Sequence, residues 1–255
     1  VYKSGSIDIG KNKVSDWNSV GWGNITYDKG FTYSSNVGSI HIAKNYLSPN
    51  KLKACLRKYG FGDKTGIELS GELSGNVNFR ENIEIDWLSV SFGQGLSTTA
   101  IQQLQAVSII ANDGHMVKPH IIKKVVDNNT GEVTETKIEV SKRLAKSESV
   151  DHVKKLMYDT VNTKGATGYY YNIKDYGIIG KTGTAQIYEN GRYLSGDGNY
   201  IISFIGMFPY EDPEIVIYTA IKKPKSHNPK AMAPYVTEVI SNIAKYKNMY
   251  SEIEE

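Results

Sequence analysis

Four consecutive residues, Lys181, Thr182, Gly183 and Thr184, stand where a β-strand is expected but do not suit a strand that fills a core. The lysine supplies a cation, and the two threonine hydroxyls lie two residues apart on one face of the strand. The glycine leaves a point without a side chain, where an extended peptide can approach the strand closely. The alternative is an edge strand that lysine and glycine protect from aggregation.

A second group, Ser34 and Asn36 in the stretch YSSNVG, places a hydroxyl and an amide at a junction between a loop and a helix. The simpler interpretation of Ser34 is a helix N-cap. Neither motif is specific alone, because Lys-Thr-Gly occurs again at residues 64–66. That copy follows a helix end and a turn, where loop glycines are common. We interpret it as structural.

Three other candidates are weaker. Ser48 begins the only Ser-x-x-Lys stretch of the chain, but Pro49 follows it in the pattern of a helix N-cap and first helical residue. Cys55 is the only cysteine, which excludes a disulfide framework and most metal sites, and we expect it in the core. The five histidines form no metal-binding spacing.

The composition limits the classes of function. The chain has 255 residues, of which 40% are hydrophobic and 22% charged, enough for one large or two small domains with a proper core. The net charge is only +3 and no basic stripe is interleaved with aromatics, so no nucleic-acid partner is expected. No apolar run approaches the ~20 residues of a membrane-spanning helix.

The elements that must position these residues fall into two groups. The segment up to about Gly30 is rich in turns, and within it we expect an irregular loop at residues 11–23. Helical periodicity begins at Ser34, and further helices are expected at 48–60, 98–114, 147–162 and 233–250. Strands are expected on both sides of a turn at 129–131, and then at 177–194, 200–210 and 214–224. Consecutive strands with short turns, and helices grouped elsewhere, predict an α+β fold with an antiparallel sheet and a mainly helical subdomain.

The motifs together resemble a known family. Ser-x-Asn followed by Lys-Thr-Gly is part of the three-motif signature of penicillin-binding proteins and serine β-lactamases. The stretches GWGNITYDKGFTYSSNVG, TGIELSGELSG, SFGQGLSTTAIQQLQAVSIIANDG and GKTGTAQ occur in the order seen in class B penicillin-binding proteins. Over about residues 4–245 the chain resembles their transpeptidase domain, most of all the division-associated type of Gram-positive bacteria. We expect residues 1–250 to be the C-terminal part of that domain and 251–255 a tail or linker.

The resemblance implies a peptidoglycan D,D-transpeptidase. Its substrate is a stem peptide that ends in D-Ala-D-Ala, and β-lactams acylate the same site. Lys181, Thr182 and Thr184 would receive the substrate's carboxylate, and the backbone N–H of Thr184 would form half of an oxyanion hole. Ser34 would relay a proton to the leaving amine. Asn36 would hold the substrate amide. No cofactor is implied.

One part of the signature is missing. The family's nucleophile is the serine of a Ser-x-x-Lys motif ahead of Ser-x-Asn, and no such motif precedes Ser34. We expect the nucleophile to lie on a missing N-terminal segment, which would also anchor the protein at the extracytoplasmic face of the membrane. Division proteins are further expected partners. Glu72 lies near the place of the deacylating glutamate of class A β-lactamases, but the resemblance puts it in a glycine-rich turn. The alternatives are a β-lactam-sensing receptor domain and a non-catalytic scaffold of the same fold.

Overall fold

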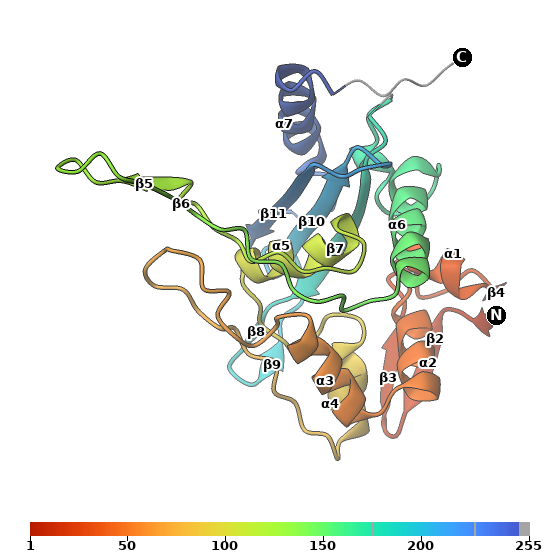
Figure 1. Cartoon of the computed structure of the whole chain (residues 1–255). Helices are drawn as coiled ribbons and strands as arrows, with labels where there is room; N and C mark the ends of the chain where they lie inside the picture. The colour runs from red at the N-terminus through yellow and green to blue at the C-terminus, as the bar shows by residue number, and fades with distance from the viewer. Residues whose placement is uncertain (175, 227, 250–255) are drawn as a thin grey trace.

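A three-stranded antiparallel sheet forms the centre of the molecule (Figure 1). The computed structural model describes residues 1–174, 176–226 and 228–249, so the expected tail at 251–255 lies outside the described residues. The strands β7 (Ile179–Gln186), β10 (Tyr200–Phe208) and β11 (Ile215–Lys222) run in the order β11-β10-β7. Among the described residues β7 therefore pairs with β10 alone and forms an edge of this sheet.

Helices cover both faces of the sheet, and the middle strand β10 is therefore buried on both sides. Ile202 and Phe204 of β10 pack with α7 (Ala233–Tyr246), whereas Met207 packs with α5 (Ala100–Ala111) and α6 (Ser147–Asn162). Burying a large apolar side chain contributes about 1.5–3 kcal/mol. The alternation along β10 thus fixes which face of β7 looks towards α5 and α6 and which towards α7.

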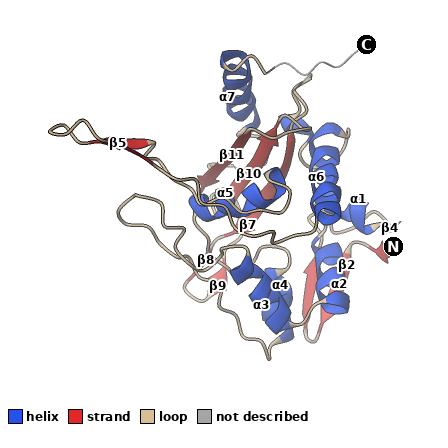
Figure 2. Ribbon diagram, in the orientation of Figure 1, coloured by secondary structure: helices blue, strands red, loops and turns tan. Residues whose placement is uncertain are grey.

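The helices expected from residue 98 onward are confirmed within the described residues. The helix α5 begins with a capping box, in which the Thr99 hydroxyl accepts from the Gln102 backbone and the Gln102 side chain accepts from the Thr99 backbone. The helices α6 and α7 cover most of the segments that their periodicity predicted. The two strands around the turn at 129–131 form as β5 (Lys124–Val126) and β6 (Val133–Glu135), in a ribbon that projects from the body (Figures 1 and 2).

The first thirty residues are more regular than we predicted. They form the short strands β1 (Tyr2–Lys3), β2 (Ser6–Ile9), β3 (Asn12–Ser15) and β4 (Asn24–Ile25), in the antiparallel pairs β1-β4 and β2-β3. The irregular loop expected at residues 11–23 was wrong at 12–15, because these residues pair with β2 as the short strand β3. On β2, Ile9 is buried against Ile40 and Leu88 of the helical part.

The mainly helical subdomain is confirmed. It packs α2 (Asn36–Tyr46), α3 (Pro49–Lys58) and α4 (Glu84–Val90) around a cluster that includes Ile40, Leu52 and Leu88. The short helix α4 was not predicted. Cys55 on α3 is half-buried rather than fully in the core. The remaining elements are the one-turn helix η1 (Tyr169–Tyr171) and the small hairpin of β8 (Tyr188–Glu189) and β9 (Arg192–Tyr193).

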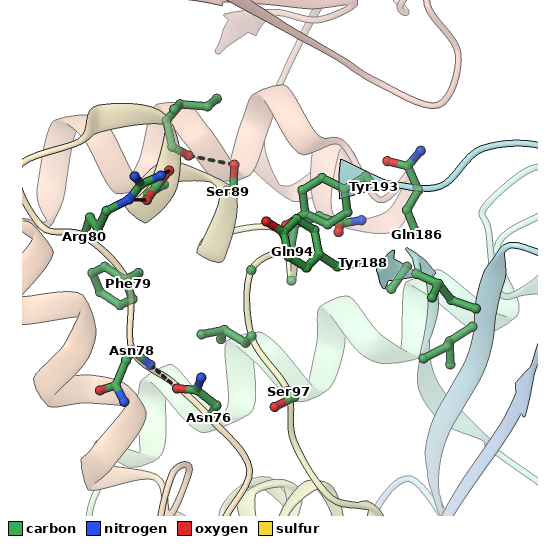
Figure 3. Close-up of a pocket in the computed structure, with 18 of the residues that line it drawn as sticks. Asn76, Asn78, Phe79, Arg80, Ser89, Gln94, Ser97, Gln186, Tyr188 and Tyr193 are labelled. Carbon is green, nitrogen blue, oxygen red and sulfur yellow. Dashed lines mark hydrogen bonds and ion pairs between the residues drawn. The ribbon is translucent and has the colours of Figure 1, made fainter. Parts of the chain in front are cut away.

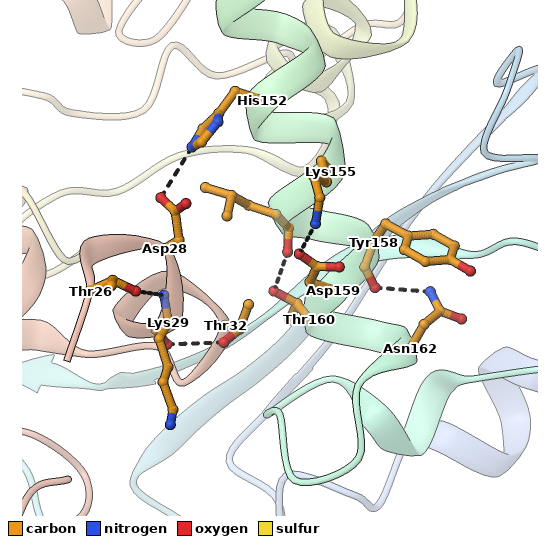
Figure 4. A network of polar contacts seen from close by, with 11 residues as sticks. Thr26, Asp28, Lys29, Thr32, His152, Lys155, Tyr158, Asp159, Thr160 and Asn162 are labelled. Carbon is orange, nitrogen blue, oxygen red and sulfur yellow. Dashed lines mark hydrogen bonds and ion pairs between the residues drawn. The ribbon is translucent and has the colours of Figure 1, made fainter.

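The short helix α1 (Tyr27–Thr32) links the helical subdomain to the part around the central sheet, because it leads directly to Ser34 and lies against α6. The Thr26 hydroxyl caps it, and Nε2 of His152 on α6 lies 3.1 Å from Oδ1 of Asp28 (Figure 4). Within the described part of the chain, no helix combines the length and the apolar character that crossing a bilayer requires.

Candidate active site

Ser34 lies in a tight turn between two helices, and its backbone is strained. The helix α1 ends at Thr32, and α2 begins at Asn36 with Ser35 as its N-cap, whose hydroxyl accepts from the N–H of Gly38. The N-cap interpretation of Ser34 was therefore wrong by one residue. Ser34 has φ +56°, a left-handed conformation that costs a non-glycine residue about 1–3 kcal/mol and is common at functional sites. This conformation leaves its hydroxyl free of capping.

Lys181 reaches this hydroxyl from the central sheet. Its Nζ donates to Oγ of Ser34 at 2.7 Å and to the carbonyl oxygen of Thr182 at 3.0 Å, and it lies 5.9 Å from the centre of the Phe31 ring. Burial lowers the pKa of Lys181 to about 8. At neutral pH the ammonium group still carries its proton, so Ser34 accepts a hydrogen bond from a cation. The structure thus joins the two motifs that the sequence separates.

The register of β7 sorts the other motif residues by face. Thr182 and Thr184 are paired with Phe204 and Ile202 of β10, so both threonines lie on one face, as predicted. Lys181 and Gly183 lie on the opposite face. A Cβ on Gly183 would come within 2.6 Å of Oγ of Ser203 on β10. The cross-strand neighbour is thus a second reason for glycine here, beside the approach of a substrate backbone.

The backbone of β7 offers hydrogen-bonding groups at its free edge. The N–H of Ile187 donates to the carbonyl of Asn199 on the β10 side of the ladder. Because bonded pairs alternate along an antiparallel ladder, the N–H groups of Thr182 and Thr184 point away from β10. An extended peptide can therefore add to this edge as a further strand.

The edge is supported by two residues that we did not predict, Thr167 and Thr32. The Thr182 hydroxyl donates to Oγ1 of Thr167 at 3.1 Å, and the Thr167 hydroxyl donates to the carbonyl of Thr32 at 3.1 Å. Thr167 lies in a loop after α6 whose sequence, GATGY, gives no signal of this role. Thr184 is exposed and stands at the open end of the edge.

A cavity of about 300 Å³ brings all six predicted residues together. Ser34 and Asn36 form one wall, and β7 forms another with Lys181, Thr182, Gly183 and Thr184. Ser91 and Phe92 also line it. They belong to the stretch SFGQG, which carried part of the family resemblance but had no predicted role. All six predicted site residues therefore lie around one cavity.

The side chain of Asn36 is fixed by a hydrogen bond that we did not predict. Its side-chain Nδ2 donates to the carbonyl oxygen of Ser15 at 2.9 Å, at the end of β3. This bond orients the amide, with Oδ1 as the atom left for a ligand.

A larger cavity of about 670 Å³ lies farther along β7, past Ala185 (Figure 3). Its lining includes Gln94 and Ser97, together with Tyr188 and Tyr193 of the β8–β9 hairpin. The two cavities follow each other along the strand. The smaller one holds the predicted site residues.

The structural interpretations of the competing motifs agree with the contacts. The Glu72 carboxylate accepts hydrogen bonds from the backbone N–H and the hydroxyl of Thr65 at 2.7 and 2.6 Å. Glu72 therefore supports the second Lys-Thr-Gly copy within a glycine-rich turn. Ser48 is the N-cap of α3, and its hydroxyl accepts from the N–H of Lys51.

Comparison with known proteins identifies the family. The model of the penicillin binding protein transpeptidase domain matches residues 1–243. The chain belongs to this family. Stage V sporulation protein D of Bacillus subtilis is 34% identical over 225 residues, which cover 88% of this chain and 34% of that protein. Peptidoglycan D,D-transpeptidase MrdA of Haemophilus influenzae is 26% identical over 259 residues, covering 92% of this chain and 40% of that protein.

A solved structure supports the same assignment. Penicillin-binding protein 3 from Mycobacterium tuberculosis complexed with ampicillin has a TM-score of 0.86 and 28% identity, over 99% of this chain and 57% of that one. This transpeptidase-domain chain spans about a third of the length of Stage V sporulation protein D. The predicted fold is confirmed, as is the class B family resemblance.

Proposed function

We propose that this transpeptidase-domain chain supplies the substrate-binding side of a serine-type peptidoglycan D,D-transpeptidase that β-lactams acylate. The observation that carries the proposal is the 2.7 Å hydrogen bond from Nζ of Lys181 to Oγ of Ser34. It places a cation and a hydroxyl beside a strand edge that can bind a peptide. The names of the relative from Haemophilus influenzae and of the ampicillin complex support the same activity.

The substrate would lie along β7 as an added strand. The carboxylate of the terminal D-alanine would be bound by the hydroxyls of Thr184 and Thr182, the second of which would turn its proton from Thr167 to the carboxylate, with the positive charge of Lys181 nearby. Hydrogen bonds to a charged group contribute about 1.5–3 kcal/mol each, so two or three of them can orient a short peptide. The carbonyl that is attacked would then face the outward N–H of Thr184, which supplies one oxyanion donor.

The nucleophile would be the serine of a Ser-x-x-Lys motif outside these 255 residues. Its oxygen would attack the carbonyl between the two D-alanines while a base outside these 255 residues takes its proton. The C–N bond would then break, and the leaving amine would take a proton from Ser34, which Lys181 replenishes through its hydrogen bond. The acceptor amine of a second stem peptide would then attack this ester, form the new amide bond by giving up a proton, and return the serine to its hydroxyl form. Asn36 would hold the substrate amide through Oδ1.

Labelling with a fluorescent penicillin tests this proposal. The complete protein, with its preceding segment, and the 255-residue chain alone are each incubated with the label and measured by intact mass under denaturing conditions. We expect one adduct on the complete protein, on a serine of Ser-x-x-Lys outside this chain, and none on the chain alone. An adduct on Ser34 or Ser48, or none on the complete protein, would overturn the proposal.

A second assay separates a transpeptidase from a receptor domain or scaffold. A receptor would form the penicillin adduct but would not release D-alanine from a stem pentapeptide. We expect the complete protein to release D-alanine in the presence of an acceptor amine, and Ser34→Ala to reduce this release.

The cellular setting is proposed from the resemblance alone. We place the complete protein at the extracytoplasmic face of the membrane, anchored by a preceding segment, as a division-associated protein of a Gram-positive bacterium. Division proteins would be its partners. Loss of membrane association on deletion of that segment would support this placement.

A further inference from the structure

Asp16 is a buried carboxylate directly behind the site, and neither the motifs nor the proposed chemistry uses it. It follows the last residue of β3 and is only 3% exposed. Its Oδ1 accepts from the hydroxyl of Ser35 at 2.9 Å and from the N–H of Val37 at 3.0 Å. Its Oδ2 accepts from the N–H of Gly5 at 2.9 Å. A buried charge with three donors of this kind is a built arrangement and not an accident of packing.

The groups that Asp16 holds are neighbours in sequence of the predicted site residues. Ser35 lies between Ser34 and Asn36, and Val37 follows Asn36, so the carboxylate fixes the turn from its buried side. Asn36 is fixed from the same element, because its amide donates to the carbonyl of Ser15. Two neighbouring residues at the end of β3 thus restrain the whole of the turn at residues 34–37.

The charge of Asp16 also suits its position. Val37 is in the first turn of α2, where unpaired N–H groups and the helix dipole favour a negative charge. The first turn of α2 contains no acidic residue of its own. Asp16 supplies that charge from the segment that follows β3. It therefore stabilises the start of α2 and can offset the strain of Ser34, whose φ is +56°.

We propose that Asp16 is a positioning residue of this transpeptidase site, which acts through Ser35 and Val37 to keep Ser34 in contact with Lys181. It does not touch the cavity itself. This inference rests on the proposed function, because its consequence for catalysis requires that Ser34 acts in the reaction. The restraint on the turn can be measured without that assumption.

The first test is hydrogen exchange on the 255-residue chain, which requires no nucleophile. The variants are Asp16→Ala, which removes all three acceptors, and Asp16→Asn, which keeps the shape and one carbonyl acceptor. We expect amide exchange in residues 34–38 to rise by about tenfold or more in Asp16→Ala and less in Asp16→Asn, with β10 and β11 unchanged. Exchange that is unchanged at 34–38, or that rises equally in the sheet, would overturn the inference.

The second test is the acylation rate of the complete protein by a fluorescent penicillin. We expect Asp16→Asn to lower the second-order rate by about tenfold or more while the penicillin concentration for half-saturation changes little, because the change acts on the turn and not on the binding edge. Asp8→Asn is the matched control, since Asp8 is an exposed carboxylate on the neighbouring strand β2. It should acylate like the unmodified protein.

The outcomes separate the two proposals. If the unmodified complete protein forms no adduct, the proposed function fails, and the exchange experiment still decides whether Asp16 restrains the turn. If it forms an adduct and Asp16→Asn forms it at the same rate, the role of Asp16 is excluded while the proposed function stands.

Discussion

The chain contains Lys-Thr-Gly twice, at residues 64–66 and 181–183, and the two copies have opposite surroundings. Lys181 is half-buried on the edge strand β7, and its Nζ contacts Ser34. Lys64 is exposed in a loop. Thr182 lines the cavity, whereas Thr65 is buried and held by Glu72.

The glycines differ as well. Gly66 has φ +80°, so its backbone requires glycine for the turn itself. Gly183 has no such φ and is constrained by its neighbour Ser203. The same three residues therefore serve a turn in one place and form the proposed binding edge in the other. Their role follows from the element that carries them and from the groups that face them.

Replacing each lysine by alanine gives the largest expected difference between the copies. In the complete protein, Lys181→Ala removes the cation beside the strand edge and the donor to Ser34, and we expect the penicillin acylation rate to fall by about a hundredfold or more. Lys64→Ala is the matched control and should leave the rate near its original value. Similar rates for the two variants would remove the distinction between the copies.

The sequence predicted the helices and the central sheet well because their signals are local. The segment that forms α6 carries a continuous helical pattern, and Thr99 and Gln102 form a capping box that marks the start of α5. The six site residues also gathered in one cavity, since they belong to motifs whose order along the chain is specific.

The supporting groups could not be predicted because their signals are not local. Asp16 and Thr167 stand in loops, and their partners Ser35 and Thr182 belong to other segments, 19 and 15 residues along the chain. The strand pairs of the first thirty residues were missed for a similar reason, as two- to four-residue strands carry no readable alternation. In the case of Ser34, the helix cap lay one residue later than the N-cap alternative placed it, because the turn puts Ser34 in a left-handed conformation.

A pH titration tests the lowered pKa of Lys181, and its expected effect is smaller than that of Lys181→Ala. The pKa of Lys181 is about 8 in the folded chain, against 10.5 as its ordinary value, because burial disfavours the charged form. Between these two values the unfolded chain binds more protons, so the free energy of unfolding should rise with pH in this window. The gain is at most about 3 kcal/mol, from the conversion of a pKa difference into free energy.

The measurement is urea unfolding of the chain at several pH values across this window. Lys181→Met has no proton to lose there, and we expect it to lack the rise that the unmodified chain shows. Because both proteins contain the same tyrosines and other lysines, their difference isolates Lys181. Parallel curves for the two proteins would mean that Lys181 is not buried as the structure has it.

The smallest expected effect comes from breaking the support of the second copy. Glu72→Ala removes the acceptor of the Thr65 hydroxyl and backbone N–H and leaves a buried hydroxyl without this partner. We expect the chain to lose about 1–2 kcal/mol of stability, since an unpaired buried donor costs about that much. The hydrogen bond from the Thr65 hydroxyl lowers the pKa of Glu72, so this contribution should be present at neutral pH and fade as the pH falls through the acidic range.

Acylation of the complete protein should be unaffected by Glu72→Ala, because the turn at 64–66 contributes no residue to the cavity at Ser34. The opposite expectation applies to a deacylating glutamate, whose loss would lengthen the life of the penicillin adduct. Measuring adduct formation and adduct decay in the same variant therefore distinguishes a support for a loop from a group that activates water. A slower decay without a loss of stability would move Glu72 from the structural copy into the active site, and the distinction between the two copies would then rest on Lys181 alone.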